Sequence, residues 1–343
     1  MKTYLFVFGR NPELSFLELT QFLSGRNISY KIFEAVKEIA VVQVENIPED
    51  LANILGGTVR IGEVIARNIE GLEKNSFDYF NKMQMSICVY SNSQLYEPVR
   101  NFLKKKAKEE HIKYLLSKDT APSKIREGFE ILLFKDHIAK TVSIFHPQAY
   151  KERDKRPCND FLKNTSIRLS RILIHLSGKP SGTLLDPFCG TGVILQEGVL
   201  LGYDVLGLDA DEKSVQCSRK NLFWIQQKYK TARAFKVQSG NALTIPYDHF
   251  DVIVSEPYLG PYIRGILRPS EAEKIKRDLE RLYIQFFRNL GRCRVVFILP
   301  RFQLKNKILN LERVFGDFKI LHGPLLYADE NSKIIREIYV LEK

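Results

Sequence analysis

One short segment contains residue types that can bind and orient a planar ring carrying an amino group. The apolar run FDVIV ends there in Ser255, Glu256, Pro257 and Tyr258. An amino group conjugated into a ring is a poor nucleophile, and hydrogen-bond acceptors on its hydrogens help it to pyramidalise. The carbonyl of Glu256 and the hydroxyl of Ser255 are candidate acceptors, while the ring of Tyr258 can stack on a base. The pattern predicts chemistry at an exocyclic amine. The alternative is a turn that merely closes a strand, with the tyrosine filling a core.

A second segment, LLDPFCGTG at residues 184–192, is typical of a ligand-binding turn between a strand and a helix. Gly190 and Gly192 allow the backbone to approach a ligand, and a helix N-terminus offers free N–H groups. The G-x-G-x-x-G pattern of dinucleotide-binding proteins is absent. Asp186 would repel a pyrophosphate and would suit the cationic, amino-bearing end of S-adenosylmethionine. Phe188 belongs to the same predicted cofactor loop.

Residues after two further predicted strands complete the group of predicted cofactor-binding residues. Asp209 lies about twenty residues on, where a carboxylate can accept hydrogen bonds from both ribose hydroxyls. Asn241 follows the third strand and can contact an adenine edge. The order fits a class I methyltransferase. The alternative is a glycine turn in another doubly wound protein, in which Asp186 only caps a helix.

The elements that must position these residues are predicted from the apolar pattern. In the C-terminal half, an amphipathic helix precedes short apolar strands that alternate with helices, as in a parallel sheet. The five strand segments are TLLDPF, DVLGLD, FKVQS, FDVIVS and RVVFILP. FKILHG and REIYVLEK are predicted to close the chain as antiparallel strands. This half, residues 166–343, is predicted to be one Rossmann-like α/β domain.

The N-terminal half is predicted to hold two small α+β units. Residues 1–75 follow the order strand, helix, two strands, helix, strand of a ferredoxin-like unit. Residues 76–147 contain a strand, a lysine-rich helix and further strands. Residues 148–165 are polar, lack a period and are predicted to be a linker.

The charge and cysteine content of the chain indicate which kinds of partner and site to expect. The formal charge of +12 and a pI near 9.3 favour an anionic partner. Nucleic acid comes first, ahead of an acidic membrane surface or of a charge that only aids solubility. Five cysteines without a CxxC pair, and scattered histidines, predict reduced thiols and no metal site. With no signal peptide or membrane-spanning stretch recognised, the predicted location is the cytoplasm.

The motifs together resemble one known family. LLDPFCGTG, GLDADEKSV, GNA and SEPYLG occur in the order found in the THUMP-containing tRNA guanine-N2 methyltransferases that act at the guanosine in position ten. AYKERDKRPCNDFLKNTSIRLSRILIHLSG is similar to that family's linker and entry helix, with His-Leu-Ser where the family has Asn-Leu-Ser. YLFVFGRNPELSFLEL is similar to its N-terminal opening. The resemblance covers nearly the whole chain and is strongest at 148–260.

The resemblance implies a THUMP-like RNA-binding domain at 76–147 and catalysis with S-adenosylmethionine on tRNA. It implies that Asp186, Gly190 and Gly192 face the methionine end of the cofactor, Asp209 the ribose and Asn241 the adenine. Ser255, Pro257 and Tyr258 would take the catalytic-loop positions, with Glu256 as a new carboxylate. A small activating subunit is left open as a partner, and DNA is not expected.

Two departures from the family pattern keep alternatives open. Ser255 and Glu256 replace the family's Asp-Pro, and Asn241 stands where Asp is common. Glu256 either takes over the acceptor role or turns to an arginine such as Arg264 or Arg268. The competing functions are methylation of another exocyclic amine, such as adenine N6, and a tRNA-binding protein whose catalytic site has decayed.

Basic residues are the predicted RNA contacts, because phosphate contacts supply much of the affinity for nucleic acid. They are Lys104, Lys105, Lys106, Arg153, Lys155, Arg156, Arg264 and Arg268. A charge run on one helix is also often no more than a solvated face.

Overall fold

The structure is a computed structural model. It describes residues 1–75, 82–91, 93–119, 128–159, 165–244, 249–261, 268–304, 308–328 and 333–343.

The chain divides into two compact units. The first comprises residues 1–16 and 27–151, and the second comprises residues 17–26 and 152–343. The helix α1 (Pro12–Gly25) therefore contributes its first turn to one unit and the rest to the other.

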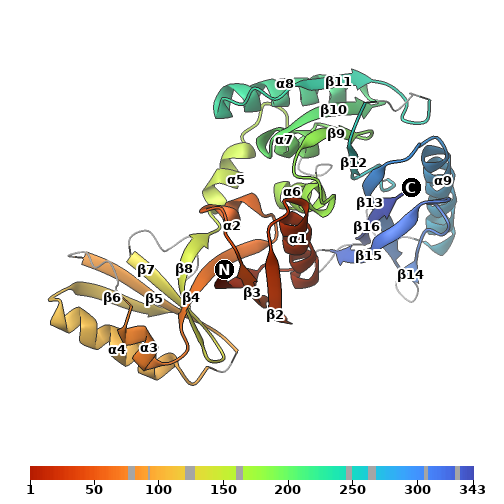
Figure 1. Cartoon of the computed structure of the whole chain (residues 1–343). Helices are drawn as coiled ribbons and strands as arrows, with labels where there is room; N and C mark the ends of the chain where they lie inside the picture. The colour runs from red at the N-terminus through yellow and green to blue at the C-terminus, as the bar shows by residue number, and fades with distance from the viewer. Residues whose placement is uncertain are drawn as a thin grey trace. The chain divides into compact units, whose positions relative to one another are not determined.

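The first unit is built on one eight-stranded sheet, coloured from red to yellow in Figure 1. The strand order is β2-β3-β1-β4-β8-β7-β5-β6. The strands are β1 (Lys2–Phe8), β2 (Tyr30–Val36), β3 (Ile39–Val44), β4 (Thr58–Ala66), β5 (Lys82–Tyr90), β6 (Lys113–Lys118), β7 (Gly128–Phe134) and β8 (His137–Ile144). The helices are α2 (Leu51–Ile54), α3 (Ile69–Glu73), α4 (Tyr96–Glu109) and the start of α5 (Pro147–Arg153).

The first four strands follow the predicted ferredoxin-like order. β1 pairs antiparallel with both β3 and β4, and β2 pairs antiparallel with β3. The sheet then continues without a break, because β4 also pairs antiparallel with β8. The predicted boundary near residue 75 thus joins two halves of a single sheet and does not separate two sheets.

Helix α4 carries the predicted lysine cluster and has a clear buried stripe. Val99, Phe102, Leu103 and Ala107 pack with Ile87 and Ile131 in the core between helix and sheet. Their spacing of three and four residues puts them on one side of the helix. The lysines between them are therefore placed toward the solvent side.

The second unit contains the predicted Rossmann-like sheet. Its strand order is β11-β10-β9-β12-β13-β16-β15, with β14 paired to β13. The strands are β9 (Gly182–Asp186), β10 (Tyr203–Asp209), β11 (Phe235–Ser239), β12 (Val252–Ser255), β13 (Arg294–Gln303), β14 (Ile308–Leu309), β15 (Lys319–Tyr327) and β16 (Ile334–Glu342). The helices are α6 (Ile167–Leu176), α7 (Val193–Leu200), α8 (Glu212–Tyr229) and α9 (Pro269–Arg288).

The central five strands are parallel, and the last two are antiparallel as predicted. β9 pairs parallel with β10 on one side and with β12 on the other, so the chain reverses its direction of winding there. β16 inserts antiparallel between β13 and β15. In such open α/β sheets, ligands bind beyond the carboxyl ends of the strands at this switch point.

Two helical layers bury the sheet. α6, α7 and α8 contact one another in series along it (Figure 1). α9 packs its aromatic residues, including Tyr283, Phe286 and Phe287, against Phe297 of β13. Aromatic rings in edge-to-face and stacked contacts make this core dense and place α9 rigidly beside β12 and β13.

The second part of α1 is tied to α6 by a buried polar pair. Glu18 Oε1 and His175 Nδ1 are 2.8 Å apart, and both side chains are almost fully buried. Burial lowers the pKa of His175, although hydrogen bonding to Glu18 opposes this effect. His175 is the residue that replaces the family's Asn, and it has a structural partner here.

Among the described residues, no helix is long and apolar enough to cross a membrane. Within those same ranges, no cluster of three or more His, Cys, Asp or Glu side chains could hold a metal ion.

Candidate active site

The predicted site residues meet at one edge of the second sheet. Asp186 ends β9, Asp209 ends β10 and Ser255 ends β12, and these three strands are parallel neighbours. Asn241 follows β11 two residues after its end. Parallel pairing alone brings these positions together, because carboxyl ends of parallel strands lie at the same edge.

Asp186 is a buried carboxyl without a basic partner among the contacts that the structure describes. It accepts a hydrogen bond from the backbone N–H of Phe188 (3.1 Å) and one from the hydroxyl of Ser255 (2.6 Å). Burial raises the pKa of Asp186 to about 7, and the nearby charges of Asp209 and Glu256 add to this, although both hydrogen bonds oppose it. Ionised Asp186 is a buried negative charge that is costly on its own. A cation bound beside it would offset this cost and would itself be stabilised.

The glycine loop is shaped by Asp209. Its carboxylate accepts hydrogen bonds from the N–H of Gly190 (2.8 Å) and of Asp211 (2.9 Å). Gly190 has φ +52°, and a β-carbon there would meet no atom within 4 Å, so the loop faces open space at this point. Gly192 has φ +83°, and a β-carbon there would approach the Ser218 hydroxyl to 2.3 Å. The two glycines thus serve different needs: one leaves space, and the other permits tight packing.

Asn241 and Phe188 flank this loop. The Asn241 side-chain oxygen accepts from the N–H of Leu243 (2.9 Å), which leaves its NH₂ group without a partner among the described residues. Such an amide can donate to a ring nitrogen of adenine. Phe188 packs edge-on against Phe286, with ring centroids 5.3 Å apart. Its ring anchors the loop to the aromatic core.

In the SEPY segment, residues 255–258, the side chains of Ser255 and Glu256 are oriented by different strands, β9 and β16. The Ser255 hydroxyl donates to Asp186, and Ser255 is fully buried. Glu256 accepts from Arg336 of β16 (2.6 Å), so of the two alternatives it turns to an arginine; Arg264, one of the two arginines named as examples, lies outside the described residues. The Tyr258 ring is 57% exposed. Of the four predicted catalytic residues, Tyr258 is the one placed to receive a base.

Helix α9 supports this loop through one of its tyrosines. The hydroxyl of Tyr283 donates to the backbone carbonyl of Tyr258 (2.6 Å). Tyr283 is itself fully buried, and burial raises its pKa well above the ordinary value. The exposed ring of Tyr258 is therefore held through its main chain by a rigid part of the core.

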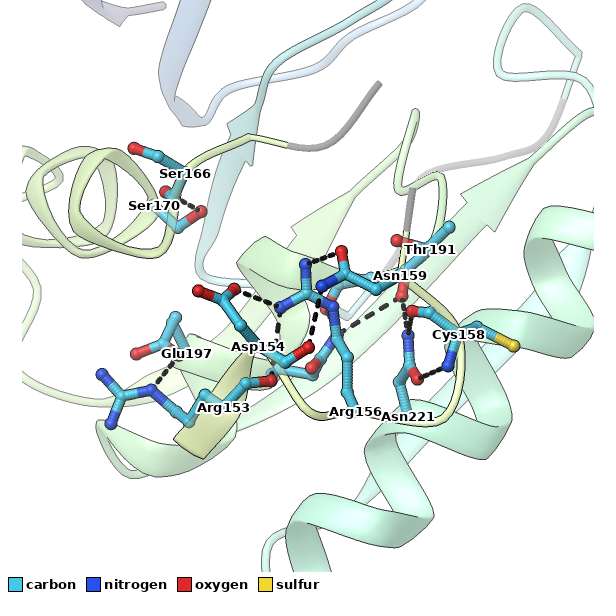
Figure 2. Close-up of polar contacts among 12 residues, drawn as sticks. Arg153, Asp154, Arg156, Cys158, Asn159, Ser166, Ser170, Thr191, Glu197 and Asn221 are labelled. Atoms are coloured by element: carbon cyan, nitrogen blue, oxygen red, sulfur yellow. Dashed lines mark hydrogen bonds and ion pairs between the residues drawn. The ribbon is translucent and has the colours of Figure 1, made fainter. Parts of the chain in front are cut away.

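The predicted linker is anchored to the second unit by buried arginines, as Figure 2 shows. Arg153 Nε lies 2.9 Å from Glu197 of α7, whose other oxygen accepts from Arg171 Nε of α6 (2.6 Å). Arg153 is 5% exposed and Arg156 is 6% exposed. The expectation that these two residues contact RNA phosphates does not hold for the folded chain, because their guanidinium groups are buried in structural contacts.

Asn221 of α8 joins the linker to the glycine loop. Its Nδ2 donates to the carbonyls of Cys158 (2.9 Å) and Thr191 (3.0 Å), and its Oδ1 accepts from the N–H of Cys158 (2.9 Å). Figure 2 shows Asn221 between these two backbone segments. Nearby, Arg156 Nη2 donates to the side chain of Asn159 (2.8 Å). The linker therefore supports the cofactor loop, a role that its polar composition concealed.

The other predicted RNA contacts keep the exposure that such a role needs. Lys105 and Lys106 are near Glu109 on α4, and Lys104 is half-buried. Lys155 is exposed and pairs with Glu152 (2.7 Å), while Arg268 is exposed at the start of α9. Arg264 lies outside the described residues.

Three supporting residues were not predicted from the sequence: Arg336, Tyr283 and Asn221. Each lies far along the chain from the segment it holds, within an ordinary helix or strand pattern. No local motif marks them. Only the unpaired charge of Glu256 pointed to a missing arginine.

Comparison with protein families identifies the methyltransferase unit. A family model described as RMKL-like methyltransferase domain matches residues 153–306, which include both the glycine loop and the SEPY segment. A second model, described as DNA methylase, matches residues 23–220, more than half of the chain, and ends before β12.

Curated relatives are similar over parts of the chain. A tRNA (guanine(10)-N2)-dimethyltransferase of Methanothermobacter thermautotrophicus is 39% identical over 123 residues, 35% of this chain and 32% of that protein. The enzyme of the same name from Pyrococcus abyssi is 28% identical over 207 residues, 58% of this chain and 56% of that protein. The matched regions span about a third to just over half of these relatives.

Solved structures establish the fold. TrmN from Thermus thermophilus superposes with a TM-score of 0.56 at 16% identity, covering 99% of both chains. SMU.472, a putative methyltransferase complexed with SAH, gives a TM-score of 0.50 at 16% identity, covering 100% of this chain and 98% of that one. Together with the strand order, these matches define a class I methyltransferase fold.

Proposed function

Because this chain belongs to the methyltransferase families described as RMKL-like methyltransferase domain and DNA methylase, we propose that it transfers a methyl group from S-adenosylmethionine to the exocyclic N2 amine of a guanine in tRNA. One observation carries the proposal. The buried carboxyl of Asp186, at the end of β9, accepts a hydrogen bond from Ser255, at the end of β12. The exposed Tyr258 follows Ser255 by three residues, so a cofactor-binding carboxyl and a base-stacking ring are linked at one edge of the sheet.

The residues at the strand ends fit S-adenosylmethionine. The carboxyl of Asp186, without a basic partner among its described contacts, suits the ammonium of the methionine part. Asp209 has further lone pairs for ribose hydroxyls, and the Asn241 NH₂ group, which has no hydrogen-bond partner among the described residues, can donate to the adenine. The open space at Gly190 admits the ligand next to the backbone. When bound, the cofactor supplies an electrophilic methyl group.

On the substrate side, Tyr258 stacks on the base and the loop orients the amine. The Ser255 hydrogen is directed to Asp186, and the Glu256 carboxylate is engaged with Arg336. We therefore assign the acceptor role mainly to the backbone carbonyl of Glu256. The amine would take the methyl group as the bond from the methyl carbon to the sulfonium sulfur breaks, which leaves S-adenosylhomocysteine; the Glu256 carbonyl would orient the amine, and the excess proton of the amine would pass to water.

The substrate class follows from the named relatives and from charge. Relatives called tRNA (guanine(10)-N2)-dimethyltransferase match the chain, and the net charge of +12 suits a polyanion. We propose that the first unit, with the lysines of α4, grips the RNA as a THUMP-like domain. We further propose a cytoplasmic location and leave room for a small activating subunit.

The test is methyl transfer from labelled S-adenosylmethionine to unmodified tRNA transcripts, followed by digestion to nucleosides and mass spectrometry. N2-methylguanosine or N2,N2-dimethylguanosine is the expected product. Absence of transfer together with absence of cofactor binding would refute the proposal and support a decayed enzyme.

A second candidate is methylation of the adenine N6 amine. The match to the DNA methylase model favours it, although that match ends before the SEPY segment. N6-methyladenosine in the same digest, or transfer to a DNA duplex in a parallel reaction, would select this candidate.

A further inference from the structure

Glu256 holds an unusual position for a charged residue in an active-site loop. Its side chain is 8% exposed, and Oε1 accepts from Arg336 Nε at 2.6 Å. Oε2 is buried and has no hydrogen-bond partner among the residues that the structure describes. Arg336 lies on β16, eighty residues away in sequence, and is 27% exposed.

Apart from packing at the buried Pro257 and beside Gly260, the loop has few other contacts among the described residues. Residues 256–261 form no helix or strand, and within the described ranges no backbone–backbone hydrogen bond involves them. Two polar contacts hold the segment: Tyr283 to the Tyr258 carbonyl, and Arg336 to Glu256. The position of the Tyr258 ring thus depends on side chains of α9 and β16.

The ion pair is a condition for the buried position of Glu256. A carboxylate removed from water needs an opposite charge, and one of the Glu256 oxygens has no donor in the part of the chain that the structure describes. Without the arginine, the charged group would move toward solvent and take the loop backbone with it. The strand β16, by contrast, is fixed by pairing with β13 and β15.

We propose that the side chains of Glu256 and Arg336 are positioning groups that together fix the position of the loop, and that neither side chain touches the reacting amine, which contacts only the backbone carbonyl of Glu256. The pair replaces, with a tertiary contact, the rigidity that a proline at position 256 would supply locally. This inference rests on the proposed function, since it concerns the same loop. A displacement of the stacking ring by about 1 Å can lower turnover roughly 10²-fold.

A first experiment measures loop position without substrate. Tyr258 is replaced by a fluorinated phenylalanine, and its ¹⁹F resonance is recorded in the otherwise unchanged chain and in Glu256→Gln and Arg336→Gln. Both substitutions should shift or broaden the signal. Arg301→Gln is the matched control, because Arg301 of β13 donates to Glu337, the neighbour of Arg336 on β16 (Nε to Oε1, 2.6 Å), and neither residue belongs to the loop. An unchanged signal in both test variants would overturn the proposal.

A second experiment separates positioning from substrate contact. With unmodified tRNA, Glu256→Gln and Arg336→Gln should each lower kcat at least tenfold with little change in cofactor affinity. The double variant should be less impaired than the product of the two effects, because two glutamine amides can hydrogen-bond to each other. If Arg336→Gln raises KM and flattens the salt dependence of RNA binding while Glu256→Gln has normal kcat, Arg336 is a phosphate contact and the proposal is wrong.

The two experiments also separate this inference from the proposed function. A wild-type chain that neither methylates RNA nor binds the cofactor refutes the proposed function, while the fluorine signal still decides whether the pair positions the loop.

Discussion

At the scale of single residues, Asp186 links the cofactor site to pH. Its pKa is raised to about 7 by burial, and an ammonium partner needs the ionised form. We therefore expect the affinity for S-adenosylmethionine to rise as pH increases through about 7, by roughly tenfold per unit below that value. Asp186→Asn should bind weakly at every pH. Calorimetric titration from pH 5.5 to 8.5 checks this, and a flat wild-type profile would contradict it.

The raised pKa of Asp186 also predicts that the folded protein is less stable at high pH. A carboxyl whose pKa is raised on folding binds more protons in the folded state, so its stabilising contribution is lost as pH rises from its unfolded value, about 4, through about 7. Asp186→Asn lacks this loss. Melting temperatures should therefore favour the asparagine variant at pH 8 and converge with the wild type near pH 4.5. Equal melting temperatures at pH 8 would contradict the raised pKa.

Tyr258 separates base stacking from cofactor binding. Its ring is exposed, while its carbonyl is held by Tyr283, so a change of side chain leaves the main-chain contact in place. Tyr258→Ala should lose about 1–3 kcal/mol of stacking in turnover, and Tyr258→Phe should retain most of it. Single-turnover methylation measures the effect, with cofactor affinity as the control. Normal turnover by the alanine variant would show that the loop is placed incorrectly.

At the scale of elements, the linker is part of the catalytic unit. Glu197 of α7 neutralises Arg153 of α5 and Arg171 of α6, and all three side chains are buried. Glu197→Gln should lower the free energy of unfolding by about 3–5 kcal/mol, because two buried cations lose their counter-ion. Lys155→Ala, which removes a mostly exposed pair, should cost about 0–1 kcal/mol. Urea unfolding compares the two, and equal losses would contradict the anchoring role.

The elements themselves were largely predictable. The strands and most helices follow from apolar runs, glycines and prolines, because these depend on local periodicity. Two features were not predicted: the helix α3, and the continuation of the first four strands into the same sheet as the strands next to α4. That continuation depends on the pairing of β4 with β8, which are far apart in the sequence. Burial of Arg153 and Arg156 also followed from tertiary contacts, so composition alone misassigned them to RNA.

At the scale of the whole molecule, the basic surface of the first unit is expected to bind RNA through charge. Lys104, Lys105 and Lys106 are consecutive on α4, with Lys105 exposed and the other two half-buried. Changing all three to alanine should weaken tRNA binding at low salt and reduce the slope of log Kd against log salt by about 0.7–0.9 per lost contact. Filter binding at several salt concentrations measures the slope, with melting temperature as the control for folding. An unchanged slope would show a solvated face without an RNA contact.

The sequence by itself determined the class of chemistry. Strand–glycine turn–helix spacing, acids at the ends of two neighbouring strands and a polar-Pro-aromatic loop are local patterns, and the parallel sheet brings them to one edge without further information. Only the tertiary structure decided how the altered loop is oriented. Ser255 turns to Asp186 because β12 pairs with β9, and Glu256 turns to Arg336 because β16 inserts beside β13. Both pairings join distant segments that no local pattern encodes.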